Sequence, residues 1–368
     1  MWDMNLSVGI VGLPNVGKST LFNALLKKQQ ALAANYPFAT IEPNVGIVPV
    51  PDNRLIELAE LTKNEEKMSE LPPIKAATVE FVDIAGLVKG AAEGAGLGNK
   101  FLSHIREVSV IAHVVRAFED SDVLREGSVG PKEDYQTIQT ELILADMQTL
   151  DKALDNRKIE PNKKSAVLAL RKALNEGERA FNVNLSVEER ESIKDLFLLT
   201  NKPEVIVLNV TEAEYNENTI LQKVTEYAGL LDIPEDHFVV ICAKIEAELA
   251  GLEADEQQAY LAELGVGSSG LERLIKKAYE RLGLISFLTA GAKEVRAWTM
   301  RKGGNAVEAS GEIHTDFMKK FIKAEVVGFA DYFEHTGRKK AREVGKARLE
   351  GKDYIVQDGD VIEFKIGS

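Results

Sequence analysis

The chain has few of the features that mark secreted or membrane proteins. A single cysteine, Cys242, occurs among its 368 residues, which excludes an internal disulfide framework and fits a reducing compartment, by default the cytoplasm. No apolar run approaches the length that spans a bilayer. Residues 1–5 provide neither the basic nor the apolar segment of a secretory signal, so no such signal is expected.

Positive charge is also scarce. The 45 Lys and Arg residues face 58 Asp and Glu residues, and the net charge is −13. This balance argues against nonspecific nucleic-acid binding by the whole chain, although it leaves room for a local basic face. Basic residues do cluster at 338–342, where by themselves they predict only a solvated helix face. The length predicts two or three domains, because one hydrophobic core rarely serves so long a chain.

The most informative stretch lies near the start of the chain. The apolar residues 8–11 predict a buried strand, and Gly12-x-x-x-x-Gly17-Lys18-Ser19 separates them from a helical pattern. Strand, glycine loop and helix start form the required context of a phosphate loop. Backbone N–H groups of such a loop point at a polyphosphate, while Lys18 serves the β- and γ-phosphates and Ser19 offers a hydroxyl to Mg²⁺. The residues expected to contact the nucleotide here are Asn15, Val16, Gly17, Lys18, Ser19 and Thr20, with Lys18 also a catalytic candidate.

Two later segments complete the expected site. Thr40 lies in a proline-containing loop one helix further on, where switch-type nucleotidases keep a threonine for Mg²⁺ and the γ-phosphate. A plain surface loop is the alternative. Asp83 ends the predicted strand 77–83 and precedes x-x-Gly86. We expect Asp83 to hold Mg²⁺ through water and the Gly86 N–H to sense the γ-phosphate.

Efficient hydrolysis is not expected from these residues alone. Leu87 follows Gly86, at the position where many switch GTPases carry a glutamine that orients the attacking water. An aliphatic side chain cannot orient water, so hydrolysis is expected to be slow or to need another group. His113, in the predicted strand 110–118, is one candidate for that catalytic role. The alternative, which residue type alone favours, is a buried histidine with its hydrogen bonds satisfied.

The segments that would contact the base depart from the guanine-specific pattern. Strand residues 203–208 lead into Asn209-Val210-Thr211-Glu212, where GTP-specific switch proteins usually have Asn-Lys-x-Asp. The longer carboxylate of Glu212 and the missing lysine stem weaken the case for guanine selectivity. A further strand, 238–241, ends in Cys242-Ala243-Lys244, which is similar to a base-contacting loop. Cys242 is most simply a small buried residue there.

The amino-acid composition of the chain changes between residues 134 and 200. Glycines nearly vanish, charges become dense, and apolar residues step by three and four on either side of Pro161. The pattern predicts an inserted antiparallel helical hairpin with a coiled-coil-like seam, either a protruding arm for a partner or a solvated structural hairpin. From residue 285, hairpin strands, a helix and a final Asp-Gly turn predict a small α+β domain of the β-grasp kind.

In combination, these blocks resemble the YchF/Obg-like ATPase family of Obg-related translation-factor P-loop proteins. The resemblance rests on residues 12–20, 37–44, 83–90, 209–212, 294–299 and 351–361. It implies an α/β fold in which a Ras-like P-loop NTPase domain carries an inserted α-helical coiled-coil hairpin and a C-terminal TGS domain. The expected boundaries are 1–133 and 201–284 for the P-loop domain, 134–200 for the hairpin and 285–368 for the TGS domain.

The resemblance also implies an activity. Family members prefer ATP over GTP, hydrolyse it slowly with Mg²⁺ and associate with ribosomes. Asn209 and Glu212 match the family's Asn-x-x-Glu pattern, and the base is read partly by backbone near Val210. A histidine matching His113 is associated with hydrolysis, whereas Lys244 departs from the family.

We therefore expect a cytoplasmic ATP switch that acts on the large ribosomal subunit or the assembled ribosome, with RNA contact in the groove between the hairpin and the TGS domain. An Obg-type GTPase and a noncatalytic, nucleotide-dependent scaffold are the alternatives.

Overall fold

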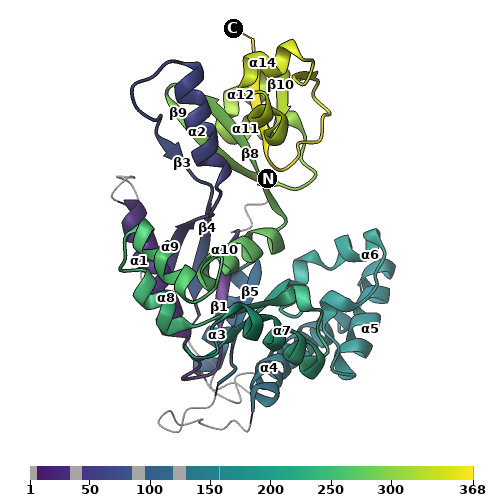
Figure 1. The fold of residues 1–368 in the computed structure, drawn as a ribbon. Helices are drawn as coiled ribbons and strands as arrows, with labels where there is room; N and C mark the ends of the chain where they lie inside the picture. The colour runs from purple at the N-terminus through teal and green to yellow at the C-terminus, as the bar shows by residue number, and fades with distance from the viewer. Residues whose placement is uncertain (1–5, 34–43, 85–95, 119–129, 157, 368) are drawn as a thin grey trace. The chain divides into compact units, whose positions relative to one another are not determined.

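The computed structural model describes residues 6–33, 44–84, 96–118, 130–156 and 158–367 (Figure 1). The chain divides into two compact units, each discontinuous in sequence. The first combines Met1–Val48 with Glu80–Leu282, and the second combines Pro49–Val79 with Gly283–Ser368. Crossing a membrane would need a longer and more apolar helix than any in the described part of the chain.

A mostly parallel sheet forms the centre of the first unit. Its strands run in the order β2-β4-β1-β5-β6-β7. Their bounds are β1 Ser7–Val11, β2 Val45–Pro49, β4 Thr78–Asp83, β5 Val110–Arg116, β6 Glu204–Asn209 and β7 Phe238–Ile241. β1, β5, β6 and β7 are buried along their whole length, as expected for parallel strands packed on both faces. The strand order reverses at β1, and ligands of open parallel sheets bind beyond the carboxyl ends of the strands at such a point.

Helices pack against this sheet in two apolar clusters. In one, Ile105 of α3 (Gly96–Glu107) and Leu142 of α4 (Pro131–Leu154) meet Val11 and Ile111. In the other, helices following β6 and β7 pack on those strands. The helices of the first unit that carry these and the other sheet contacts are α1 Lys18–Ala33, α7 Glu217–Leu231, α8 Ala243–Leu249, α9 Ala254–Glu263 and α10 Gly270–Arg281.

The predicted insertion is helical, but its first helix is shared with the sheet. Helix α4 begins at Pro131 rather than at residue 134, and its first half belongs to the cluster on the sheet. Its second half, from about Ile143, packs with α5 (Pro161–Asn175), α6 (Val187–Ser192) and the short 3-10 turns η2 (Ala180–Asn182) and η3 (Lys194–Leu196). Pro161 occupies the first turn of α5, where its missing N–H costs nothing. Ile143, Met147, Leu150 and Leu154 of α4 share one apolar cluster with Val167, Leu170 and Leu174 of α5, as the stepping of apolar residues on either side of Pro161 predicts.

The second unit is built on a mixed sheet. The strand order is β11-β10-β12-β8-β9-β3, with β8 parallel to β12 and antiparallel to β9. The strands are β3 Ile74–Lys75, β8 Leu284–Gly291, β9 Glu294–Arg301, β10 Phe321–Gly328, β11 Arg348–Glu350 and β12 Asp360–Ile366. The helices are α2 Arg54–Glu65, α11 Ala306–Ile313, α12 Thr315–Lys319, α13 Phe329–Glu334 and α14 Arg338–Glu343.

The expectation that residues 1–133 all belong to the nucleotide-binding domain is wrong for Pro49–Val79. This segment supplies α2 and β3 to the second unit, where β3 pairs with β9. Arg54 donates to Asp358 over 2.8 Å, and Glu65 accepts from the Lys339 N–H over 3.1 Å. The segment reads locally as a short amphipathic helix and a charged linker. Nothing in that pattern specifies which of two sheets its apolar face covers, because both partners lie far away in sequence.

Candidate nucleotide-binding site

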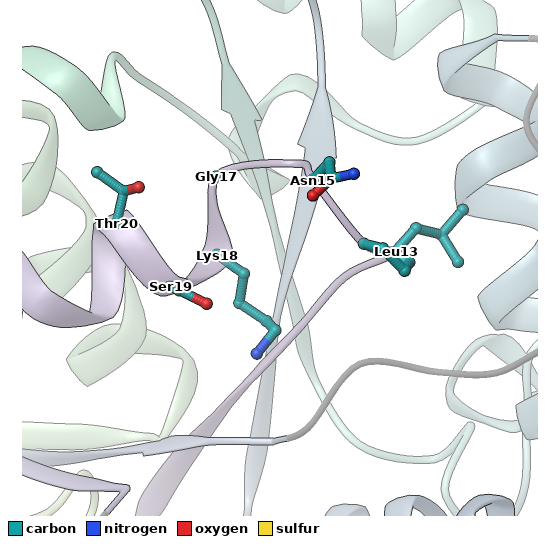
Figure 2. Close-up of a pocket in the computed structure, with 7 residues that line it drawn as sticks. Leu13, Asn15, Gly17, Lys18, Ser19 and Thr20 are labelled. Atoms are coloured by element: carbon teal, nitrogen blue, oxygen red, sulfur yellow. The ribbon is translucent and has the colours of Figure 1, made fainter. Parts of the chain in front are cut away.

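The phosphate loop lies between the end of β1 and the start of α1. Gly17 has φ +93°, and a Cβ there would lie 2.2 Å from Nδ2 of Asn209. A Cβ on Gly12 would lie 2.9 Å from the Val114 carbonyl oxygen. Both glycines are therefore required by close approach, and Gly17 also by its backbone conformation. The loop borders a cavity of about 510 Å³, lined by Leu13, Pro14, Asn15, Gly17, Lys18, Ser19 and Thr20 (Figure 2).

The structure brings the two halves of the predicted phosphate site together. The Lys18 ammonium group forms an ion pair with Asp83, and the two side chains are only 11% and 19% exposed. Parallel pairing of β1 with β4 sets Ile10 opposite Asp83, so the carboxylate stands beside the loop that follows β1. Ser19, next to Lys18, is exposed to the cavity (Figure 2). Val16 differs from its neighbours because its side chain is buried, so its contribution to the loop is its backbone.

The oxygen atoms at this site suit magnesium. Mg²⁺ prefers hard oxygen ligands and keeps several of its waters, and a carboxylate with a hydroxyl is a common protein contribution. Asp83 and Ser19 provide that pair at the mouth of the loop. Thr40, Gly86 and Leu87, the other residues predicted to serve the γ-phosphate and its hydrolysis, lie outside the described residues.

Asn209 joins the phosphate loop to the two segments expected around the base. It is 4% exposed, and its Nδ2 donates to the Val16 carbonyl over 2.9 Å. Its Oδ1 accepts from the Ala243 N–H, also over 2.9 Å. One side-chain amide thus fixes the loops that follow β1, β6 and β7 relative to one another. Asn209 acts here as a brace between loops.

The two residues predicted to read the base differ in exposure. Val210 is 2% exposed, its side chain packs in the apolar core, and its N–H donates to the Ile241 carbonyl over 2.9 Å. Its carbonyl is the polar group it would present to a base. Glu212, in contrast, is exposed, and its carboxylate lies 3.0 Å from the Lys244 ammonium nitrogen.

Comparison with known proteins places this geometry in a family. The model described as "50S ribosome-binding GTPase" matches residues 7–172, and the YchF-GTPase C-terminal model, described as "Protein of unknown function (DUF933)", matches residues 284–367. A Bacillus subtilis protein named "Ribosome-binding ATPase YchF" is 48% identical over 376 residues, covering 98% of this chain and 99% of the relative. The chain belongs to the YchF family. The resemblance expected from the sequence is thereby confirmed.

Other YchF relatives agree in length and architecture. The Escherichia coli O157:H7 protein of the same name is 46% identical over 371 residues, with 98% of this chain and 99% of the relative covered. A solved structure described as "Structure of the Schizosaccharomyces pombe YchF GTPase" aligns with a TM-score of 0.84 at 34% identity and covers 99% of each chain. The bacterial names say ATPase and the Schizosaccharomyces pombe description says GTPase, so the names alone leave the base open.

His113 occupies a buried position in this YchF chain. It lies on β5 opposite Val11 of β1 and Ile206 of β6, and it is 1% exposed. Its Nδ1 is 3.0 Å from a Glu204 carboxylate oxygen, and its ring stacks on Tyr135 at a centroid distance of 4.9 Å. These contacts fit the alternative of a buried, hydrogen-bonded histidine better than a water-positioning group already in place.

Glu204, the buried partner of His113, is a residue that the sequence pattern did not single out. It opens β6 at 1% exposure and accepts from Gln139 over 2.9 Å, from the Tyr135 hydroxyl over 3.1 Å and from Arg179. Burial acts to raise the pKa of Glu204, but Arg179 and His113 outweigh it and hold the pKa below its ordinary value. A carboxylate opening an otherwise apolar strand was the one available signal. Its partners, spread over β5, α4 and the segment after α5, could not be predicted.

Proposed function

We propose that the chain is a ribosome-associated switch that binds Mg²⁺ and ATP, prefers ATP over GTP, and hydrolyses ATP slowly. The observation that carries this proposal is the Lys18–Asp83 pair at the mouth of a glycine-braced phosphate loop. The names of the Bacillus subtilis and Escherichia coli relatives, both ribosome-binding ATPases, agree with it. The cytoplasm, where ribosomes work, is the compartment we expect.

Each residue of the site has a separate role in binding the nucleotide and Mg²⁺. N–H groups of the loop and the Lys18 ammonium hold the β- and γ-phosphates, so Lys18 exchanges a carboxylate partner for a phosphate when nucleotide binds. Asp83 is then free to hold Mg²⁺ through water, together with the Ser19 hydroxyl and Thr40. Mg²⁺, when bound, offsets negative charge on the phosphate oxygens. Asn209 keeps the base segments in register with the loop, and Val210 and Glu212 face the base.

Slow hydrolysis is expected because the residue after Gly86 in the sequence is Leu87. Leu87 cannot orient a water molecule, and His113 would have to leave Glu204 and Tyr135 to do so. We propose that His113 takes part in hydrolysis only after such a rearrangement, for which ribosome contact is the natural trigger. Residues 134–200 as a helical arm, and residues 285–368 as a TGS domain of the β-grasp kind, would each provide surface for ribosomal RNA or protein.

Single-turnover hydrolysis of ATP and of GTP, with and without ribosomes, tests the proposal. We expect slow turnover of ATP, slower turnover of GTP, and acceleration by ribosomes. Lys18→Ala should lower nucleotide affinity by roughly two orders of magnitude, because it removes a charge from a largely buried pair and from the phosphates. Lys27→Ala, on the exposed face of the same helix, is the matched control.

Three results would favour a different function or contradict the proposed site. A clear preference for GTP would indicate an Obg-type GTPase. Tight ATP binding without hydrolysis, even on ribosomes, would indicate a noncatalytic scaffold. Unchanged ATP affinity in Lys18→Ala would contradict the phosphate site itself.

A further inference from the structure

An ion pair bridges the two segments that the proposed function assigns to the base. Glu212 lies on the segment after β6, and Lys244 is the second residue of α8, which follows β7. The Lys244 ammonium nitrogen is 3.0 Å from each of the two carboxylate oxygens of Glu212. Both oxygens therefore share one cation, and the pKa of Lys244 is raised by the bond to that carboxylate. The pair spans the two loops where a purine base would enter.

The backbone beneath this pair is fixed. Asn209 holds the start of α8 through the Ala243 N–H, and the Val210 N–H bonds to Ile241 of β7. The same asparagine reaches the phosphate loop at Val16. The backbone segments that carry the carboxylate and the ammonium group are thus tied to each other and to the phosphate loop.

The chemistry of the two purines makes this placement selective. Guanine presents adjacent ring and amino N–H donors, which two free carboxylate oxygens accept together. Adenine presents one amino donor beside a ring nitrogen acceptor, and a free carboxylate repels that acceptor. When an ammonium group already engages both oxygens, the advantage of guanine is reduced and the repulsion of adenine is offset.

We infer that the Lys244–Glu212 ion pair is a specificity determinant, which masks the carboxylate against guanine and so favours adenine. The inference rests on the proposed ATP preference and assigns part of that preference to Lys244. Lys244 and Glu212 are 69% and 47% exposed, so solvent screens the pair and its effect is modest. We expect a change of about two- to fivefold in relative affinity, the range that exposed pairs support.

Competition titrations of ATP against GTP, and of ADP against GDP, test this in the full chain. Lys244→Met keeps the apolar stem but removes the charge, and it should raise GTP affinity relative to ATP by that factor. Adding Glu212→Gln to Lys244→Met should abolish the gain, because the amide no longer provides two acceptors. The control is Lys194→Met, which removes an ammonium group of equal exposure, 69%, from a pair with Glu191 on the helical segment.

The titrations distinguish a failure of the ion-pair role from a failure of the proposed ATP preference. If the unmodified chain binds GTP as tightly as ATP, the proposed ATP preference fails. If it prefers ATP but Lys244→Met leaves the ratio unchanged, the ion pair is not a determinant while the proposed function stands. A shift of the same size in Lys194→Met would show a general effect of net charge and would also overturn the inference.

Discussion

Glu204 is a buried carboxylate of the first unit that is surrounded by polar and charged partners. It is fully enclosed, and it gathers a guanidinium, an imidazole, a phenol and an amide around one carboxylate. Burying a charge in this way is tolerable only because Arg179 and the hydrogen bonds compensate it. Removing the carboxylate alone would leave Arg179 without its counter-charge. The group therefore fastens α4 and the segment after α5 to the sheet.

Glu204→Gln is expected to lower the free energy of unfolding by about 3 kcal/mol near neutral pH, because it breaks a buried pair from one side. The folded-state pKa of Glu204 lies below its ordinary value of 4.5, so its stabilisation is present above that value and is lost as pH falls through the folded pKa. Urea unfolding at pH 7 and near pH 4 would measure both effects.

The control for this variant is Glu191→Gln, an exposed member of a surface pair, which should cost under about 1 kcal/mol. An equal cost for the two variants, or a Glu204→Gln deficit that grows as the pH is lowered, would contradict a paired, ionised Glu204.

The residues that the sequence predicts well are those whose chemistry is local. Gly17, Lys18 and Ser19 lie where one short loop meets the start of α1, and the strand and helix patterns on either side specify the geometry of that loop. The partners of His113 are different, because Glu204 lies 91 positions away along the chain. Residue type alone offered a catalytic and a buried histidine, and the burial of His113 against Tyr135 and Glu204 depends on the packing of α4 on β5.

At the scale of elements, α3 is anchored at its C-terminal end by a half-buried lysine, Lys202. The Lys202 ammonium group donates to the carbonyls of Arg106, over 3.1 Å, and of Val108. Carbonyls at a helix C-terminus lack intrahelical donors and attract cations. Arg106 in turn donates to the Phe197 carbonyl over 3.2 Å. The helix that follows the segment of Gly86 is thus tied to the chain that leaves the helical insertion.

Lys202 should leave a signature in the pH dependence of stability. Burial, aided by repulsion from Arg106, lowers the pKa of Lys202 from 10.5 to about 8. Between these values the unfolded chain binds more protons than the folded chain, so the contribution of Lys202 to the free energy of unfolding rises with pH.

We expect the stability of the unmodified chain relative to Lys202→Met to increase from pH 8 to pH 10, as measured by urea unfolding. Subtracting the variant at each pH removes the contribution of the other titrating groups. A difference that stays flat, or that falls over this range, would show that Lys202 keeps an ordinary pKa.

Helices and strands were predictable here to the extent that their patterns are periodic. Strand 110–118 appears as Val110–Arg116, and strand 238–241 appears as Phe238–Ile241. The insertion was harder, because α4 carries apolar residues for the sheet in one half and for α5 in the other. The apolar residues of α4 repeat with the same helical spacing throughout, so the sequence does not show where their packing partner changes.

At the scale of the whole molecule, the chain passes from the first unit to the second, returns to the first, and ends in the second. Pro49–Val79 departs after β2, completes the second unit with α2 and β3, and rejoins the first sheet at β4. The C-terminal family model, residues 284–367, does not include this segment. The second unit is therefore specified by two stretches of sequence, and its stability should respond to substitutions in the earlier one.

Leu58→Ala tests this dependence. Leu58 is fully buried in α2, so truncation should cost about 2–5 kcal/mol in the second unit. Hydrogen exchange should show lost protection for amides of β8 and β9, while amides of β5 and β6 keep theirs. Ile56→Ala, at an exposed position of the same helix, should leave both sets unchanged. Lost protection in β5 and β6 alone would contradict the division into units.

In the proposed switch, the nucleotide held at Lys18 controls association with ribosomes. Cosedimentation with ribosomes, in the presence of ADP or of a nonhydrolysable ATP analogue, measures this most directly. A larger pelleted fraction with the ATP analogue, and equal fractions for both nucleotides in Lys18→Ala, is the result that we predict. Equal pelleting of the unmodified chain in the two nucleotide states, or no pelleting in either, would contradict it.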